Sequence, residues 1–158
     1  MNLQDEQLLG QAISLAAAAR AAGSRPFGAL LADQDGNVVM TALNTTVTEH
    51  DSTAHAEMNL LRAANRQIDA LLLHTCSLYT STEPCVMCTG AIYWAGIRRV
   101  VFALSAVELS HLQGSDPYSD LLLSSKVIFA AGARPTIVEG PALTEQALAV
   151  HQGFWAKN

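Results

Sequence analysis

Two short segments of the chain carry side chains that can bind a metal ion and move a proton. Residues 55–57 read HAE, and residues 84–88 read PCVMC. Imidazole nitrogen and thiolate sulfur are good zinc ligands, and a catalytic zinc site has three protein ligands and leaves its fourth position to water. The sequence therefore predicts a catalytic zinc site, with one ion per chain held by His55, Cys85 and Cys88.

The spacing of the two cysteines suits a single ion. Residues three apart at a helix start lie on the same side of the helix, so the sulfur atoms of Cys85 and Cys88 can converge. Pro84 suits a first helical turn, where the positive end of the helix dipole favours ionised thiols. Zinc held in this way acidifies its water ligand toward neutral pH, which makes a hydroxide available.

Glu57 is the candidate for proton transfer. An ideal helix would turn His55 and Glu57 about 200° from each other, so they cannot share a regular helical face. We therefore expect His55 at an irregular helix start, with its ring toward the metal and Glu57 toward the water. The carboxylate would take the proton of the water and later deliver it to a leaving nitrogen.

Two other interpretations of the same residues are open. A closed structural zinc site would need a fourth ligand, for which Cys76, His50 or His74 is available. Such a site belongs to a zinc-stabilised interaction module without turnover, whereas a redox C-x-x-C pair needs no metal at all. Neither interpretation explains a glutamate beside His55, so the catalytic one is preferred. Cys76 itself lies in an apolar run and is expected in the core.

Apolar periodicity and turn residues indicate the elements that position these segments. Apolar residues spaced by three and four predict a first helix that ends before Gly23. An Asp-Gly turn joins two strands in a hairpin, and the later segments alternate between helix and strand. The expected strands are 27–32, 38–43, 76–80, 99–104 and 135–139, the further helices are 54–64, 84–94 and 143–150, and a turn is expected at 114–117.

Strands that alternate with helices predict an α/β fold. Crossover helices must bury an apolar stripe against the sheet, so we expect a three-layer α/β/α sandwich around a central, mixed, five-stranded sheet. No linker, repeat or low-complexity stretch calls for a second domain. Residues 1–158 are therefore expected to form one domain, with residues from about 142 to 158 as a C-terminal helix and tail.

Bulk composition excludes several classes of protein. The chain has 158 residues, of which 50% are hydrophobic and 15% charged, which argues against disorder. Its formal net charge of −5 disfavours extended binding to a phosphate backbone. The N-terminal region lacks a basic segment before its apolar run, and no apolar stretch is long enough for a membrane span. A cytoplasmic protein without membrane contact is expected.

The two segments together resemble the signature of the cytidine deaminase superfamily, H-x-E followed by P-C-x-x-C. The second segment lies within TSTEPCVMCTGAIYWAG, at an expected strand-to-helix junction. The chain looks most similar to the branch that contains guanine deaminase, tRNA adenosine deaminase and yeast-type cytosine deaminase. The resemblance covers most of the chain, from PFGA at 26–29 to VF at 101–102. It implies the cytidine deaminase fold, hydrolytic deamination and a homodimer that packs helices near the zinc sites.

Several substrate contacts are implied by the resemblance. Asn44 matches an asparagine that hydrogen-bonds the ring, although an Asn here can also cap a turn. Ala56 and Cys85 match positions whose backbone groups face the substrate or water, and Glu83 matches the pocket edge. Phe27 and Trp94 are candidate walls. The neighbours Tyr93 and Trp94 also suit the core or a dimer surface.

The C-terminal third holds further candidates. Asp116 is either a turn carboxylate or the counterpart of a substrate-binding aspartate in guanine deaminases. Phe154 and Trp155 either anchor the tail or, as in related free-base deaminases, close over the pocket and stack on the ring. His111 and His151 are expected on the surface or in loops.

Composition also bears on the substrate. The tRNA-editing relatives present a basic C-terminal helix, whereas residues 144–158 contain a single Lys and no Arg. A flipped tRNA base needs an open site with basic surroundings, whereas a free base needs a small closed one. We therefore expect a small nucleobase-like substrate, guanine or a guanine-like ring first and a cytosine-like ring second. Editing of tRNA adenosine to inosine is the alternative.

Overall fold

A five-stranded mixed sheet forms the centre of the computed structural model, which describes residues 1–114 and 121–155. The strand order is β2-β1-β3-β4-β5. Strand β1 pairs antiparallel with β2 and β3, while β3–β4 and β4–β5 are parallel. The bounds are β1 (Gly28–Ala32), β2 (Val38–Leu43), β3 (Ser77–Thr82), β4 (Arg99–Leu104) and β5 (Ile137–Glu139). The mixed sheet expected from the sequence is confirmed.

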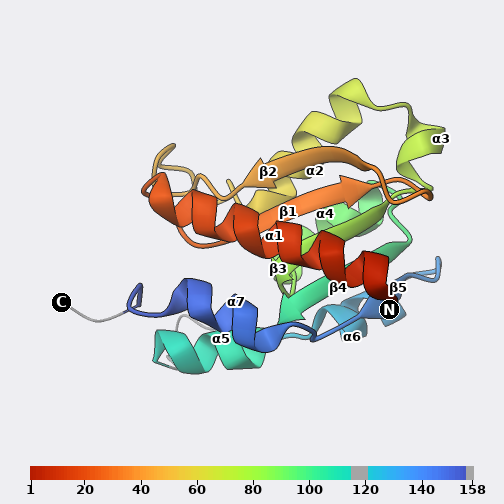
Figure 1. Cartoon of the computed structure of the whole chain (residues 1–158). Helices are drawn as coiled ribbons and strands as arrows, with labels where there is room; N and C mark the ends of the chain where they lie inside the picture. Colours follow the sequence, from red (N-terminus) through yellow and green to blue (C-terminus); the bar gives the residue numbers. More distant parts are fainter. Residues whose placement is uncertain (115–120, 156–158) are drawn as a thin grey trace.

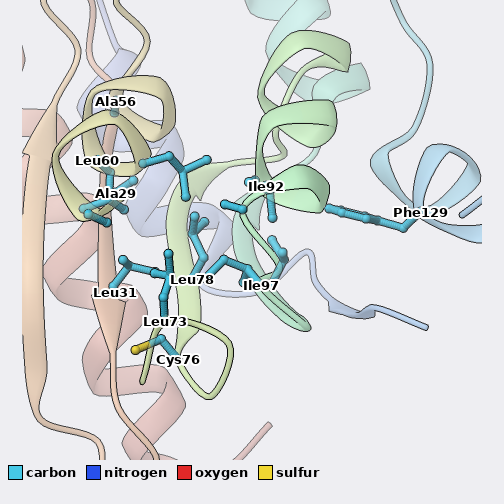
Figure 2. Close-up of a cluster of buried hydrophobic side chains, with 14 residues drawn as sticks. Ala29, Leu31, Ala56, Leu60, Leu73, Cys76, Leu78, Ile92, Ile97 and Phe129 are labelled. Carbon is cyan, nitrogen blue, oxygen red and sulfur yellow. The ribbon is translucent and has the colours of Figure 1, made fainter. Parts of the chain in front are cut away.

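Helices cover both faces of this sheet (Figure 1). The longest, α1, packs with α7 on one face, around a cluster that includes Leu9, Leu30 and Val101. The opposite face carries α2 and α4, and Figure 2 shows Leu60, Leu78 and Ile92 meeting there. The three-layer sandwich is therefore confirmed. The helices are α1 (Leu3–Ala21), α2 (Ala56–Gln67), α3 (Ala70–Leu73), α4 (Val86–Trp94), α5 (Ala106–Gln113), α6 (Ser125–Ala130) and α7 (Thr144–His151).

A glycine allows β1 to approach α1 closely. A Cβ atom on Gly28 would lie 2.5 Å from the backbone nitrogen of Ala16 and 2.5 Å from the Cβ of Leu15. The N–H of Gly28 donates to Ser81 Oγ on β3 at 3.1 Å. These contacts fix the start of β1, and so they fix Phe27, the residue immediately before it.

The structure corrects several element boundaries. The second helix begins at Ala56 because His55 is its N-cap, with extended backbone (ψ 153°). Similarly, α4 begins at Val86 because Cys85 is its N-cap, with ψ of 172°, so Pro84 precedes the helix instead of starting it. Strand β3 runs to Thr82, two residues beyond the expected end.

Helices α5 and α6 were not expected from the sequence. Ser105 caps α5 in a reciprocal capping box, in which its hydroxyl accepts from Glu108 N–H and Glu108 accepts from Ser105 N–H. Helix α5 ends at Gly114, which is left-handed (φ 96°). The rest of the turn expected at 114–117 lies outside the described residues. Among the described residues, no helix combines the length and the apolar character needed to cross a membrane.

Candidate active site

The loop between β2 and α2 carries Asn44 and His55, and Asn59 holds it in place. The Asn59 side-chain amide donates to Leu43 O at 2.9 Å, Thr45 Oγ1 at 2.8 Å and Ala54 O at 3.3 Å. Backbone bonds from Asn44 N to Phe27 O and from Thr45 N to Ala54 O close the same loop. The start of α2 is therefore fixed relative to the sheet edge.

The predicted metal ligands come together where α2 and α4 begin. His55 Nδ1 lies 3.6 Å from Cys85 Sγ and 3.5 Å from Cys88 Sγ, and the three ligand atoms all lie within 4.8 Å of one another. One imidazole and two thiols at these separations fit a zinc ion in chemistry and in reach. Within residues 1–114 and 121–155, no fourth residue joins the group, so a closed structural site does not form from the described part of the chain.

The two cysteine thiols are close enough to share a hydrogen bond, and this shifts their pKa values in opposite directions. A hydrogen bond from Cys88 lowers the pKa of Cys85 to about 4, and His55 adds to this effect. The pKa of Cys88 is raised, because its proton is shared with Cys85 and because it is buried. The pKa of His55 is raised by its hydrogen bond to Cys85. Cys85 as N-cap of α4 and Cys88 in the first turn both lie where the helix dipole favours thiolate.

Glu57 lies beside the ligand group and is buried. Its Oε1 accepts from Thr80 Oγ1 at 3.1 Å, and its Oε2 lies 3.6 Å from Cys88 Sγ. Burial raises the pKa of this carboxyl, which brings its proton exchange closer to neutral pH. Glu57 therefore lies beside the ligand group and on the cavity, the position that a proton-transfer group needs.

A cavity opens onto these groups, and together with the open space at its mouth it measures about 350 Å³. Its described lining comprises Phe27, Asn44, His55, Glu57, Thr82, Glu83, Cys85 and Leu109. A wider space continues outward from it, with Arg25, Ala106, Gln113 and residues 121–123 in its lining. A lining that combines an aromatic ring with a few converging polar groups is typical of a site for one small flat ring.

Asn44 faces this cavity with its amide group fixed. Its Oδ1 accepts three hydrogen bonds, from Ser24 Oγ at 3.0 Å, Thr46 N at 3.1 Å and Thr46 Oγ1 at 2.8 Å. With the oxygen occupied by donors, the NH₂ group is the part of the side chain that remains to face a ligand. Asn44 thus both organises its loop and lines the cavity.

Glu83 lines the cavity but is occupied by other protein groups. Its Oε1 accepts from Ser124 Oγ at 2.9 Å, Ser125 N at 2.9 Å and Ser125 Oγ at 2.8 Å, and its Oε2 accepts from Ala106 N at 3.2 Å. Burial alone would raise the pKa of Glu83, but these hydrogen bonds lower it overall. The side chain therefore anchors the starts of α5 and α6 at the pocket edge.

The C-terminal aromatic residues support a wall of the cavity from behind. The ring of Phe27 lies 5.4 Å from that of His151 and 6.2 Å from that of Trp155, centroid to centroid. Trp155 Nε1 donates to His151 Nδ1 at 3.1 Å, and Phe154 packs edge-on against Trp155. Phe154 and Trp155 are absent from the cavity lining of the described residues and instead pack behind Phe27; of the two roles considered for them, this position corresponds to anchoring the tail.

His151 corrects the expectation of a surface or loop position. It lies on α7 with 2% of its surface exposed, while His111 is exposed as expected. Burial and the neighbouring Arg20 lower the pKa of His151 to about 4. Its ring is therefore neutral at physiological pH and can accept the hydrogen bond from Trp155.

Three further substrate contacts were expected from the sequence, namely Trp94, Ala56 and Asp116, and only Ala56 lies at the site within the described residues. Trp94 is 83% exposed at the end of α4, packs against the Tyr93 ring and lines neither space in the described chain. Ala56 is the first residue of α2, where backbone N–H groups have no partner within the helix. Asp116 lies outside the described residues.

The sequence analysis does not single out three residues of the site, which are Thr80 beside Glu57 and the cavity-lining Thr82 and Leu109. Thr80 holds Glu57, and Thr82 lines the cavity two residues further along the same strand. The available signal was the period of two in a strand, which places both threonines on one face. The strand expected from the sequence ends at residue 80 and therefore does not include Thr82.

Comparison with known proteins agrees with this geometry. Residues 2–104 match the family model described as the cytidine and deoxycytidylate deaminase zinc-binding region. A probable cytosine deaminase of Schizosaccharomyces pombe is 40% identical over 156 residues, covering 96% of this chain and 93% of that protein. A tRNA-specific adenosine deaminase of Haemophilus influenzae is 40% identical over 101 residues, covering 64% and 58%.

A solved structure extends the similarity to the fold. Guanine deaminase from Nitrosomonas europaea superposes with a TM-score of 0.81 at 29% identity, covering 95% of this chain and 84% of that one. The three relatives represent the three kinds of enzyme in the branch that the motifs resemble. With its His/Cys/Cys group and adjacent glutamate, the chain belongs to the cytidine and deoxycytidylate deaminase family and is a zinc-dependent deaminase.

Proposed function

We propose that this enzyme removes an amino group by hydrolysis from a small nucleobase-like ring, guanine or a guanine-like base first and a cytosine-like base second. The observation that carries the proposal is the position of Glu57, which is buried beside the zinc ligand group and lines the cavity. A closed structural site would have no use for this carboxylate. The similarity to a guanine deaminase and to a probable cytosine deaminase supports the two ring classes.

The chain's own residues divide the work. His55, Cys85 and Cys88 would hold the zinc, which when bound acidifies a water molecule for attack on the ring. Glu57 takes a proton from the water and returns it to the departing amino group, so that water and the amine exchange to give a carbonyl and ammonia. Thr80 keeps the carboxylate in place by its hydrogen bond.

Ring binding is proposed to use three features of the cavity. The Asn44 NH₂ group donates to a ring acceptor, because its amide oxygen is already occupied. The N–H of Ala56 at the start of α2 supplies another donor. Phe27, supported by His151 and Trp155, gives an aromatic face against which a flat ring can stack.

Editing of tRNA is the alternative, because a tRNA-specific adenosine deaminase is among the relatives. The net charge of −5 and the absence of Arg from residues 144–158 argue against a large anionic partner. Ammonia release should be measured with guanine, cytosine, adenine, their nucleosides, pterins and triazines, and with tRNA in a separate assay. We expect turnover of free rings, and turnover of tRNA alone would overturn the substrate assignment.

The proton-transfer role is tested by Glu57→Gln. The amide cannot accept the proton of the water, so ammonia release should fall by at least about 100-fold, within the range that general acid–base groups contribute. Zinc content, measured by plasma emission spectrometry, should remain at one ion per chain. Glu49→Gln, on an exposed loop, is the matched control and should keep wild-type activity. Full turnover by the Glu57 variant would exclude the mechanism.

We also infer that residues 1–158 form one deaminase domain that assembles as a homodimer and works in the cytoplasm. The exposed ring of Trp94 on α4, one of the helices that begin at the zinc site, supports the dimer. Cys85 and Cys88 must stay reduced to bind a metal, and a reducing compartment provides that condition.

A further inference from the structure

Thr82 carries a buried hydroxyl group without a hydrogen-bond partner. The residue is 4% exposed, and among the side chains of the described residues its Oγ1 is the buried polar atom that no protein group satisfies. Buried polar groups in folded proteins are nearly always paired, and an exception calls for a ligand, a water or an ion. Thr82 also lines the cavity of the active site.

The neighbouring hydroxyl on the same strand face shows what surrounds Thr82. Alternate residues of β3 point the same way, so Thr80 and Thr82 share the face covered by α2 and α4. Thr80 donates to Glu57, and three residues after Thr82 the chain reaches Cys85. Thr82 therefore lines the cavity on the same strand face as Thr80, which holds the proton-transfer group.

The other buried hydroxyls nearby have partners, and Ser81 Oγ, for example, accepts from Gly28 N–H at 3.1 Å. Thr80 Oγ1 donates to Glu57, and Thr89 Oγ1 on α4 donates to Pro84 O at 3.1 Å. Leaving a buried hydroxyl unpaired costs free energy in the unliganded protein. Valine has the same shape without this cost, so a structural role alone would favour Val at position 82.

We propose that the Thr82 hydroxyl binds a polar edge atom of the substrate ring, a ring nitrogen, a carbonyl oxygen or an amino group, and so contributes to the choice of ring. This assignment rests on the proposed function. A hydroxyl can both donate and accept, so it suits any of these atoms. Sites built to hydrogen-bond a substrate group discriminate strongly against rings that lack it, because the protein group is then left unpaired.

The test compares Thr82→Val, which removes the hydroxyl at constant shape, with Thr82→Ser, which keeps it. For the ring that the wild type deaminates best, kcat/KM should fall about tenfold or more in the Val variant and stay within about threefold in the Ser variant. Zinc content should remain at one ion per chain in both. Equal kcat/KM of the Val variant and the wild type for every ring would overturn the assignment.

Binding can be measured without turnover in the Glu57→Gln background. Adding Thr82→Val should raise the Kd of the substrate about tenfold by isothermal titration. Substrate analogues that each lack one polar edge atom identify the contacted atom. For the analogue that lacks the contacted atom, the Kd should exceed that of the substrate in the Glu57→Gln variant. In the variant that also carries Thr82→Val, the analogue and the substrate should have equal Kd values. If no analogue shows this coupling, the hydroxyl does not contact the ring.

Thermal unfolding separates substrate contact from a structural role. Thr82→Val should leave the Tm of the unliganded enzyme unchanged or higher, whereas Thr89→Val should lower it by about 2–4 °C, because its hydroxyl has a partner. A clear drop in the Tm of the Thr82 variant would contradict the assignment. The two proposals fail in different ways. If the wild type releases ammonia from no ring, the proposed function is refuted. If the wild type is active but Thr82→Val behaves like it, only the Thr82 assignment is refuted.

Discussion

At the scale of single residues, zinc affinity depends on three atoms supplied by two helix starts. Cys88 is fully buried and lies 3.5 Å from His55 Nδ1, whereas Cys76 is equally free of disulfides but donates to Leu72 O in the core. Both thiols are buried, but Cys88 lies beside His55 whereas Cys76 contacts only the core. Substituting each cysteine in turn therefore distinguishes the effect of losing a metal ligand from the effect of changing a buried cysteine.

We predict that Cys88→Ser loses zinc. Serine oxygen is a poor zinc ligand at neutral pH, so zinc content should fall from one ion per chain toward zero, and ammonia release with it. Cys76→Ser should keep one ion per chain, although its unfolding midpoint will be lower because a polar oxygen enters the core. Both contents are measured by plasma emission spectrometry after gel filtration. Full zinc content in the Cys88 variant would contradict the ligand assignment.

The ligands were predictable from the sequence, because their chemistry is concentrated in two short motifs. No sequence motif marks Thr82. Its importance follows from two features of the folded chain, the lack of a hydrogen-bond partner for its hydroxyl and its position in the cavity lining. Glu83 was placed correctly at the pocket edge, but its hydrogen bonds reach residues up to 42 positions away along the chain. Partners at such separations are set by packing, which no local pattern encodes.

At the scale of elements, one carboxylate holds two helix starts at the mouth of the cavity. Glu83→Gln places an NH₂ donor where the described structure needs only acceptors, so it must break bonds to Ala106 or to Ser124 and Ser125. We predict a Tm lower by about 2–4 °C and faster amide exchange at the starts of α5 and α6. Glu145→Gln, at an exposed site on α7, should change neither. Unchanged exchange in the Glu83 variant would show that other contacts hold these helices.

The His151 cluster makes the stability of α7 depend on pH. The pKa of His151 is about 4 in the folded protein, so between its ordinary value near 6.5 and 4 the unfolded chain binds a proton that the folded chain does not. The free energy of unfolding should therefore fall as pH drops through this window, by about 1–3 kcal/mol from this residue.

Urea unfolding of three proteins isolates the contribution of His151. His151→Phe cannot titrate, so its stability should change less between pH 6.5 and 4 than that of the wild type, even though Trp155 loses its acceptor. His111→Phe, on the exposed side of α5, should keep the wild-type slope. Zinc release at low pH affects all three alike, so it cancels in the comparison. Equal slopes for all three would mean that His151 does not titrate differently on folding.

Periodicity predicted every strand and the helices with long apolar stripes, but not the short helices. Helix α5 has only 8 residues, and the Ser105–Glu108 capping box that starts it is the local sequence signal for this helix. Helix α6 has 6 residues, which is too short for a clear period of 3.6. The helix starts at 56 and 86 were missed by two residues, because the N-caps His55 and Cys85 carry no capping oxygen to mark them.

At the scale of the whole molecule, the proposed homodimer depends on a surface that no short sequence motif marks. Trp94 has 83% of its surface exposed at the end of α4, and a large aromatic side chain of this kind is typical of interface anchors. We predict that Trp94→Glu shifts the enzyme from dimer to monomer at micromolar concentration, measured by sedimentation velocity. Val107→Glu, at an exposed site on α5, is the control and should sediment as the wild type does. If Trp94→Glu also sediments as a dimer, like the wild type and the Val107 variant, Trp94 does not lie in the interface.

The cavity is built from two parts of the chain, one inside and one beyond the match to the family model. The zinc ligands, Glu57 and Thr82 all lie within the family match, which ends at residue 104. Leu109 and residues 121–123 also line the space and come from beyond that match. Mutations in the second part can reshape the pocket without disturbing the chemistry. An evolving or engineered member of this family can therefore change its substrate while its reaction stays the same.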